Sequence, residues 1–295
     1  MIIMKELAYL NGIYCPIDQA MVSIEDRGYL FGDGVYEVVA CYHGKPFLLD
    51  AHLARLRKSL AAVRIDYDWD QCPFEPIIEQ GLRKSAMGRR GMVYIQITRG
   101  TEARSHVYGD GLTPTVVLTF KPMEPLSAAR RQRGVHMMTA EDIRWAHCFI
   151  KAITLLPNVL VKNEATRKGF DDAIFVTPTG EVRECTSANV FIANDGVLTM
   201  PPRTRSVLHG VTQGFLIQCA EGIGLKVREA SFDVATMMSA DEVFLSSTTV
   251  EVLGVTQIDG RAVADGKVGA TTQRLYREFR KRADALSQGE TSMAG

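Results

Sequence analysis

The sequence predicts an α+β fold in two domains, and three observations lead to this prediction. The chain has 295 residues, 46% of them hydrophobic, which is enough to bury a core in each of two domains. Strand-like and helix-like stretches are mixed without the strict strand–helix–strand repeat of a doubly wound parallel sheet. A basic, Pro-containing stretch over residues 121–134 interrupts the pattern. We therefore place a domain boundary there, which gives a smaller domain over residues 1–125 and a larger one over residues 126–295.

The first domain begins with a hairpin. Asn11-Gly12 between apolar flanks is the preferred two-residue hairpin turn, so residues 8–14 should form a strand pair. Apolar residues then recur at helical spacing and predict a helix over residues 52–64. Apolar periodicity and β-branched runs predict the rest of this domain, namely a helix over 75–87 and strands over 92–98 and 115–120.

The second domain mixes strands with three helices. Turn signals at Thr179-Gly180 and Asp195-Gly196 separate short β-branched runs. The expected strands cover residues 135–138, 173–176, 190–193 and 243–245. The expected helices cover residues 157–168, 211–222 and 268–286.

Composition restricts the classes of partner. The 34 basic and 34 acidic residues cancel, so no overall field attracts the chain to nucleic acid or to an anionic membrane. No secretory signal and no membrane-spanning stretch is expected, so the sequence predicts a cytoplasmic protein. The six cysteines show no C-x-x-C pair and should be mostly buried, reduced thiols. We expect a small-molecule partner and no metal site.

Lys151 is the first candidate for chemistry because it lies within an apolar run, residues 148–156. An ammonium group in such surroundings loses hydration, and desolvation lowers the pKa of a lysine. The resulting neutral amine could attack a carbonyl and form a Schiff base. The alternative is a lysine that extends to the surface from a half-buried strand.

An aldehyde cofactor bound to Lys151 would need a carboxylate at its ring nitrogen and a cup for its phosphate. Glu184 precedes an apolar strand and is a candidate for the carboxylate, or else a solvated glutamate at a strand end. The segment from Leu208 to Thr212 opens a helix through a glycine and could bind an anion at the helix N-terminus. The hydroxyl cluster over residues 246–249 ends a strand and could add donors. Arg55 lies off the apolar stripe of its helix, which by pattern alone makes it a solvated arginine.

A segment that follows the strand over 92–98 could bind a substrate carboxylate. In it, Arg104 offers a bidentate fork and His106 offers a further donor. The alternative is a basic surface loop. Residues 26–36 are rich in glycine, but Gly28, Gly32 and Gly34 do not fit the G-x-G-x-x-G spacing, so a dinucleotide loop is not predicted.

Together these segments resemble the fold-type IV pyridoxal phosphate aminotransferases, and within them the D-amino acid aminotransferases most closely. The resemblance covers residues 8–282 and is carried by four motifs in order. They are Asp26-Arg-Gly-Tyr-Leu-Phe-Gly-Asp-Gly-Val-Tyr-Glu37, Thr98-Arg-Gly-Thr-Glu-Ala-Arg-Ser-His106, Glu141-Asp-Ile-Arg-Trp145 with Ile150-Lys-Ala152, and Ser247-Thr-Thr249. The resemblance implies a small N-terminal α/β domain and a larger C-terminal domain with pyridoxal 5′-phosphate between them.

The resemblance also implies a role for each candidate residue. Lys151 would be the Schiff-base lysine, and Glu184 would hold the pyridine nitrogen. The implied phosphate ligands are Arg55, Val211, Thr212, Ser247 and Thr248. Val211 and Thr212 belong to the segment that starts at Leu208. The substrate carboxylate would be held by Tyr36 together with Arg104 and His106, and in similar proteins that arginine and histidine come from the neighbouring subunit. A homodimer is therefore implied.

Two positions depart from the family pattern. Residues 185–188 read Cys-Thr-Ser-Ala where relatives carry Gly-Ser-Ser-Ser, and Gln213 replaces an arginine that commonly follows the phosphate segment. Neither change removes a group that the chemistry needs.

The expected function is transamination between D-amino acids and 2-oxo acids. The alternatives with the same cofactor are a branched-chain L-amino acid aminotransferase and an aminodeoxychorismate lyase. The Arg104-Ser-His106 segment favours the D-specific interpretation. A non-catalytic cofactor carrier is the alternative from another class, and the complete set of carboxylate ligands argues against it.

Overall fold

The computed structural model describes residues 6–289, which fold into two compact units. The first unit comprises residues 6–125 together with 150–154 and 286–289. The second comprises residues 126–149 and 155–285. Strands and helices alternate irregularly in both units, and this confirms the α+β prediction. No helix in the described range is both long and apolar enough to cross a membrane.

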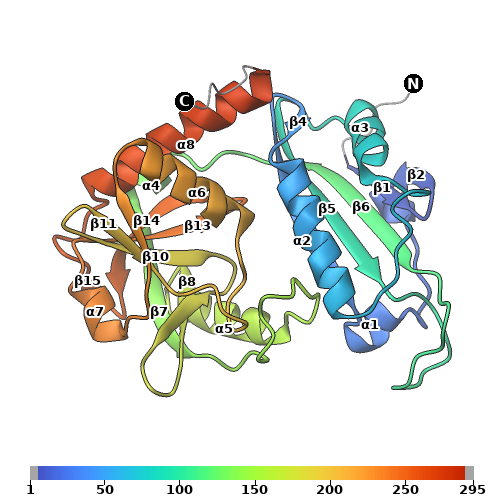
Figure 1. Ribbon diagram of the computed structural model, residues 1–295, viewed down its shortest axis with the longest axis horizontal. Helices are drawn as coiled ribbons and strands as arrows, with labels where there is room; N and C mark the ends of the chain where they lie inside the picture. Colours follow the sequence, from blue (N-terminus) through green and yellow to red (C-terminus); the bar gives the residue numbers. More distant parts are fainter. Residues whose placement is uncertain (1–5, 290–295) are drawn as a thin grey trace. The chain divides into compact units, whose positions relative to one another are not determined.

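The first unit is built on one sheet with the strand order β2-β1-β6-β5-β3-β4, in which all pairs are antiparallel. Helix α2 packs against β3 and helix α3 packs against β1. Figure 1 shows α2 in blue along this sheet. The elements are β1 (Leu7–Leu10), β2 (Ile13–Pro16), the 3-10 helix η1 (Ile17–Gln19), α1 (Arg27–Phe31), β3 (Gly34–Tyr42), β4 (Lys45–Pro46), α2 (Leu49–Ala62), α3 (Phe74–Lys84), β5 (Arg90–Thr98) and β6 (Thr115–Pro122).

The predicted hairpin and helix of the first unit are confirmed. Leu10 pairs with Ile13 across the turn, where Asn11 and Gly12 have φ values of 44° and 97°. Two consecutive positive φ angles match the twist of the strands, and this conformation favours Asn-Gly. Helix α2 begins three residues before the expected start and buries the predicted leucines, Leu53, Leu56 and Leu60.

The second unit contains a longer sheet in the order β12-β11-β10-β13-β14-β7-β8-β9, with β15 paired to β14. Its last strand β9 also contacts β10 near the other end of this order, so the sheet curls back on itself. Its elements are α4 (Ala128–Arg133), β7 (Val135–Glu141), α5 (Leu156–Arg167), β8 (Asp172–Val176), β9 (Val182–Cys185), β10 (Asn189–Asn194), β11 (Val197–Met200), α6 (Val211–Gly222), β12 (Lys226–Glu229), α7 (Val234–Met238), β13 (Glu242–Ser247), β14 (Glu251–Ile258), β15 (Arg261–Ala262) and α8 (Ala270–Gln288).

A packed core supports the second unit. Buried side chains from β7 to β14 meet α7, and the central residues include Met137, Ile174, Val190 and Leu253. Helix α6 packs on β12 and β13, and α5 packs on β7 and β8 (Figure 1). All six cysteines are free thiols and four of them are buried, as expected from the sequence.

Candidate active site

Lys151 lies in an irregular segment beside β3 and not in a strand. Its backbone N–H donates to Ser59 Oγ at 3.2 Å, and its carbonyl accepts from the Tyr36 N–H at 2.9 Å. The next residue, Ala152, forms an isolated bridge with Val35. These contacts fix the segment to the first unit on both sides of the lysine.

The Lys151 side chain is half-buried and contacts an aromatic ring. Its Nζ lies 4.1 Å from the centroid of the Tyr36 ring, which itself stacks on Tyr94 at 5.6 Å. Within residues 6–289 this ammonium makes no hydrogen bond and no ion pair. A half-buried amine that contacts only the face of a ring is available to form a covalent bond with a ligand. The lysine does not extend from a strand, because this segment is irregular and Nζ lies over the Tyr36 ring.

Arg55 belongs to a buried group that the sequence did not reveal. Its Nε and Nη2 donate to the two carboxylate oxygens of Glu37 at 2.7 and 2.8 Å. His52 Nδ1 contacts the same carboxylate at 2.8 Å, and both Glu37 and His52 are almost fully buried. Arg55 is therefore not a solvated arginine, because Glu37 on β3 fixes its guanidinium through two hydrogen bonds.

The pKa values of this group follow from burial and charge. Burial opposes ionisation of Glu37, but the charge and hydrogen bonds of Arg55, aided by His52, lower its pKa to about 2. Burial lowers the pKa of His52, and the positive charges of Arg55 and Lys151 act in the same direction against the hydrogen bond to Glu37. A neutral His52 must carry its proton on Nδ1 to donate to Glu37.

Glu184 lies on β9 of the second unit and is 5% exposed. Its carboxylate accepts from Arg144 Nη1, from the Leu208 N–H at 3.0 and 3.1 Å, and from Asn189 Nδ2 at 3.2 Å. Burial raises its pKa, and the charge of Arg144 with these donors opposes that increase. Arg144 is itself held by Asp142 through Nε and Nη2, both at 2.8 Å. The solvated alternative for Glu184 is wrong.

Asn189 connects Glu184 to the N-terminus of α6. Its amide also donates to the Leu208 carbonyl at 2.9 Å, and a Cβ on Gly210 would lie 2.1 Å from its Oδ1. The first helical hydrogen bond of α6 runs from the Gly214 N–H to the Gly210 carbonyl. The N–H groups of Val211 and Thr212 precede it, and in an α-helix such groups have no intrahelical acceptor.

The hydroxyl cluster follows β13 in the same unit. Ser247 Oγ lies 3.4 Å from Thr249 Oγ1, and Ser247 and Thr248 are both half-buried. Ser246 pairs in register with Asn189 on β10, and its Oγ is buried without a hydrogen-bond partner in the described structure. A buried hydroxyl with no partner has lost hydration without compensation, which is the state expected of a group whose ligand is absent.

Arg104 and His106 lie on an exposed loop of the first unit, between β5 and β6. Their side chains form no hydrogen bond or ion pair with any residue in the described range. Both contact one ring: the Arg104 guanidinium lies 5.3 Å and the His106 ring 5.5 Å from the Phe31 centroid. In this chain they do not contact Tyr36, the third residue of the expected carboxylate site.

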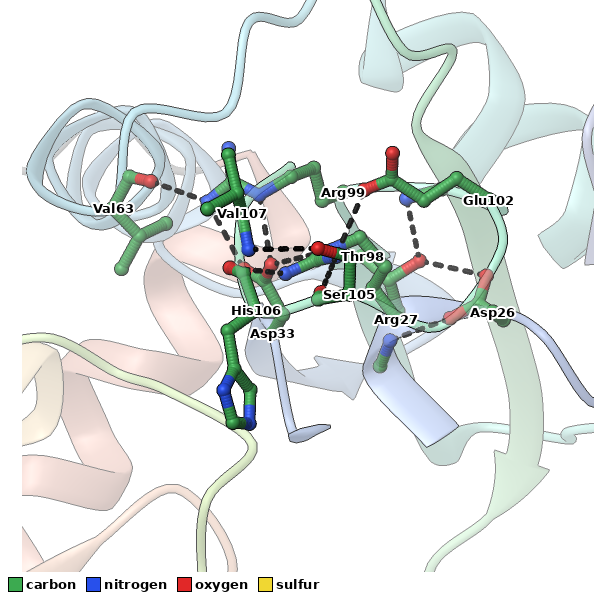
Figure 2. A network of polar contacts seen from close by, with 12 residues as sticks. Asp26, Arg27, Asp33, Val63, Thr98, Arg99, Glu102, Ser105, His106 and Val107 are labelled. Atoms are coloured by element: carbon green, nitrogen blue, oxygen red, sulfur yellow. Dashed lines mark hydrogen bonds and ion pairs between the residues drawn. The ribbon is translucent and has the colours of Figure 1, made fainter. Parts of the chain in front are cut away.

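The backbone of the loop that carries Arg104 and His106 is held by a polar network, which Figure 2 shows. Arg27, which is 3% exposed, donates to Glu102 Oε1 at 2.8 Å and to the carbonyls of Ser105 at 2.7 Å and His106 at 3.4 Å. Arg27 shares Asp33 with Arg99, at 2.9 and 2.8 Å. The His106 imidazole points away from this network.

The candidate residues are divided between the two units. The first holds Lys151, Arg55, Tyr36, Arg104 and His106, and the second holds Glu184, Leu208, Val211, Thr212, Ser247 and Thr248. Sequence reasoning missed their supports, namely Glu37, His52, Arg144, Asn189, Arg27 and Phe31. Four of them, Arg27, Phe31, Glu37 and Arg144, lie inside the motifs given above, so their position there was a usable signal.

The residues present fit pyridoxal 5′-phosphate on three observations. The Lys151 ammonium has no ionic partner in residues 6–289, a buried carboxylate at Glu184 faces several donors, and the Ser246 hydroxyl is buried without a partner. No group of three or more metal-ligating side chains occurs in that range.

Comparison with known proteins identifies the family. The family model for class IV amino-transferases matches residues 34–258. A D-alanine aminotransferase of Bacillus licheniformis is 40% identical over 90% of this chain and 93% of its own length. A D-alanine aminotransferase of Listeria monocytogenes is 40% identical over 89% of this chain and 91% of its own.

A solved structure agrees with the family. The branched-chain amino acid aminotransferase of Escherichia coli has a TM-score of 0.86 and 27% identity, over 99% of this chain and 97% of its own. The chain belongs to the class IV aminotransferases and is a pyridoxal 5′-phosphate-dependent enzyme.

Proposed function

We propose that this enzyme transfers an amino group between D-amino acids and 2-oxo acids. The observation that carries the proposal is that Arg104 and His106 lie on an anchored, exposed loop and that their side chains make no hydrogen bond or ion pair within residues 6–289. Such a pair suits the α-carboxylate of a substrate. The D-alanine aminotransferases that are 40% identical over nine-tenths of this chain support the same choice.

Lys151 would hold the cofactor covalently through its amine and, once released by substrate, move a proton between the substrate Cα and C4′ of the cofactor. The bound cofactor would supply an electron sink for the charge left at Cα. Tyr36 limits where Nζ can travel, because the amine lies over its ring. Ser59 and the β3 backbone fix the peptide from which the side chain extends.

Glu184 would bind the protonated ring nitrogen. Its carboxylate is oriented by Arg144 at Oε1, by Asn189 at Oε2 and by the Leu208 N–H at both oxygens. These donors stabilise the ionised form against burial, and an ionised carboxylate is what a protonated ring nitrogen needs. Leu208 uses its N–H on Glu184, so its side chain is the part left for contact with the cofactor.

The phosphate would be held by donors from both units. The N–H groups of Val211 and Thr212 and the hydroxyls of Ser247 and Thr248 are suited to an anion. Arg55 would add N–H donors, and Glu37 sets the direction of its guanidinium. Since Glu37 is ionised, the pair carries little net charge, and Arg55 contributes mainly directed N–H donors.

Tyr36, Arg104 and His106 would set the enantiomer. The lysine works on one face of the cofactor, so the side on which the carboxylate is held decides which Cα hydrogen faces Nζ. The described contacts do not bring Arg104 or His106 to Tyr36 within one chain, which supports donation of both to a second subunit. We therefore propose a homodimer. Its substrates are proposed to be D-amino acids and 2-oxo acids, and its proposed location is the cytoplasm.

The decisive assay follows the cofactor absorbance of purified enzyme with D-alanine, L-alanine and L-leucine, each paired with 2-oxoglutarate. The proposal expects turnover of D-alanine and little of L-leucine. Turnover of L-leucine without D-alanine would instead establish a branched-chain L-amino acid aminotransferase, the alternative favoured by the structural match to that enzyme.

A further inference from the structure

The loop from residue 101 to 110 is exposed but well anchored. Arg27 binds it at a side chain, Glu102, and at two main-chain carbonyls, Ser105 and His106. The Gly109 N–H donates to the other Glu102 oxygen at 3.1 Å. These contacts fix the backbone of the loop and leave the side chains of Arg104 and His106 to be oriented by something else.

Phe31, the last residue of α1, is in contact with both side chains. The Arg104 guanidinium lies 5.3 Å and the His106 ring 5.5 Å from its centroid, with the two rings inclined at 58°. The anchoring Arg27 guanidinium lies 4.8 Å from the same ring. One half-buried aromatic ring thus supports both of the proposed carboxylate ligands.

We propose that Phe31 is a positioning residue for the substrate α-carboxylate, acting through Arg104 and His106. This inference rests on the proposed function, in which these two side chains bind that carboxylate. The ring sets the separation and direction of both groups before substrate arrives.

An aromatic support has a specific advantage here. A carboxylate or carbonyl partner would orient Arg104 equally well, but it would occupy N–H donors and, if charged, neutralise the guanidinium. A ring face attracts the cation through its quadrupole and leaves the donors at the edge of the guanidinium available. Preorganisation by Phe31 would therefore lower the cost of ordering two flexible side chains on binding.

The test compares Phe31→Leu with a control on the same helix, Tyr29→Leu. Tyr29 is 74% exposed and makes no ring contact with the loop. We expect Phe31→Leu to raise KM for D-alanine about 10-fold, as for a misplaced binding group, with kcat changed less than about 3-fold. Tyr29→Leu should leave both constants near wild type, and Phe31→Tyr, which keeps the ring, should restore KM. Phe31→Met serves as the test variant if Phe31→Leu does not fold.

A double-mutant cycle with Arg104→Gln separates positioning from a general structural effect. If Phe31 acts through Arg104 and His106, Phe31→Leu should raise KM by a smaller factor in the Arg104→Gln background than in wild type, because only His106 is then left to misplace. If the effects of Phe31→Leu and Arg104→Gln on KM simply multiply, the inference is overturned while the proposed function stands. The same holds if Phe31→Leu has the KM and kcat of Tyr29→Leu. An unchanged KM in Arg104→Gln would instead remove the proposed role of Arg104 and this inference with it.

Discussion

At the scale of residues, charge pairs buried in each unit orient the groups expected to do the chemistry. Glu37 fixes Arg55 in the first unit, and Arg144 fixes Glu184 in the second. Lys151 differs from both, because in the described structure its amine has a ring but no ionic partner. In the proposed function the unpaired amine is the reactive group, and the ion pairs orient the other groups expected to bind the cofactor.

The Glu37 group predicts how stability responds to acid. The pKa of Glu37 is about 2, against an ordinary 4.5, so the unfolded chain takes up a proton first as pH falls. Stability from this group is present above pH 4.5 and is lost between about 4.5 and 2, by about 3 kcal/mol. The lowered pKa of His52 acts in the same direction below about 6.5, because only the unfolded histidine gains a proton there.

Urea unfolding of wild type and Glu37→Gln between pH 8 and 2.5 checks this expectation. The variant should be less stable at pH 7 by about 3 kcal/mol, since it leaves Arg55 without its counter-ion. The difference should narrow steadily below pH 4.5. A difference that stays constant over the whole range would show that Glu37 has an ordinary pKa.

Some of the residue-scale picture was accessible from the sequence and some was not. Lys151 and Glu184 could be singled out because they interrupt apolar surroundings in a recognisable order. The contact of Arg144 with Glu184 joins residues 40 positions apart, and that of Arg27 with Ser105 joins residues 78 apart. No local periodicity encodes such contacts, so the supports were missed although the supported residues were named.

At the scale of elements, the backbone of Gly210 lies close to the Asn189 side chain where α6 begins. Gly210 is the residue before the helix, and a Cβ there would meet Asn189 Oδ1 at 2.1 Å. Its φ of −65° is accessible to any residue, so only space requires glycine at this position. Gly214, one turn later in the same helix, has no neighbour within 4 Å of such a Cβ.

These two glycines give a matched pair of substitutions. Gly210→Ala should displace Asn189 and weaken binding of pyridoxal 5′-phosphate about 10-fold, a typical cost of overpacking. Gly214→Ala should leave binding unchanged and stabilise the helix by up to roughly 1 kcal/mol. Cofactor titration followed by absorbance, with thermal unfolding of both variants, measures each effect. If both variants bound pyridoxal 5′-phosphate with equal affinity, the close approach of Gly210 to Asn189 would have no role in cofactor binding.

Periodic elements were predictable, and buried strands without alternation were not. The helix over residues 211–222 has the bounds of α6, and the strand over 92–98 lies within β5. Strand β14 was missed because nearly every residue in it is buried, so the two-residue alternation of a half-buried strand is absent. Strand β3 was missed for the same reason, and the glycine-rich segment that leads into it does not by itself indicate a strand.

At the scale of the whole molecule, the proposed assembly places Arg104 of one chain in the site of another. The α+β class and the family follow from patterns spread along the chain. The proposed second subunit cannot be predicted from such patterns, because no pattern within one chain records which residues meet across an interface.

Mixing two variants tests the exchange of Arg104, assayed at a D-alanine concentration far below the KM of Arg104→Gln, where each variant alone has little activity. Refolded together, Lys151→Ala and Arg104→Gln chains should form heterodimers in which one of the two sites has both groups intact. About a quarter of wild-type activity per site should return, given random pairing. If Arg104 acted within its own chain, no mixture would recover activity, and each variant measured alone provides the baseline.

The central claim is that the Lys151 amine is the covalent attachment point for pyridoxal 5′-phosphate. Borohydride reduction of the loaded enzyme, digestion and mass spectrometry test it directly. The account predicts a phosphopyridoxyl group on the peptide containing Lys151, and none in a Lys151→Ala enzyme that retains its fold, since alanine keeps the backbone bonds to Ser59 and Tyr36. An adduct on another lysine, or none in enzyme saturated with cofactor, would contradict it.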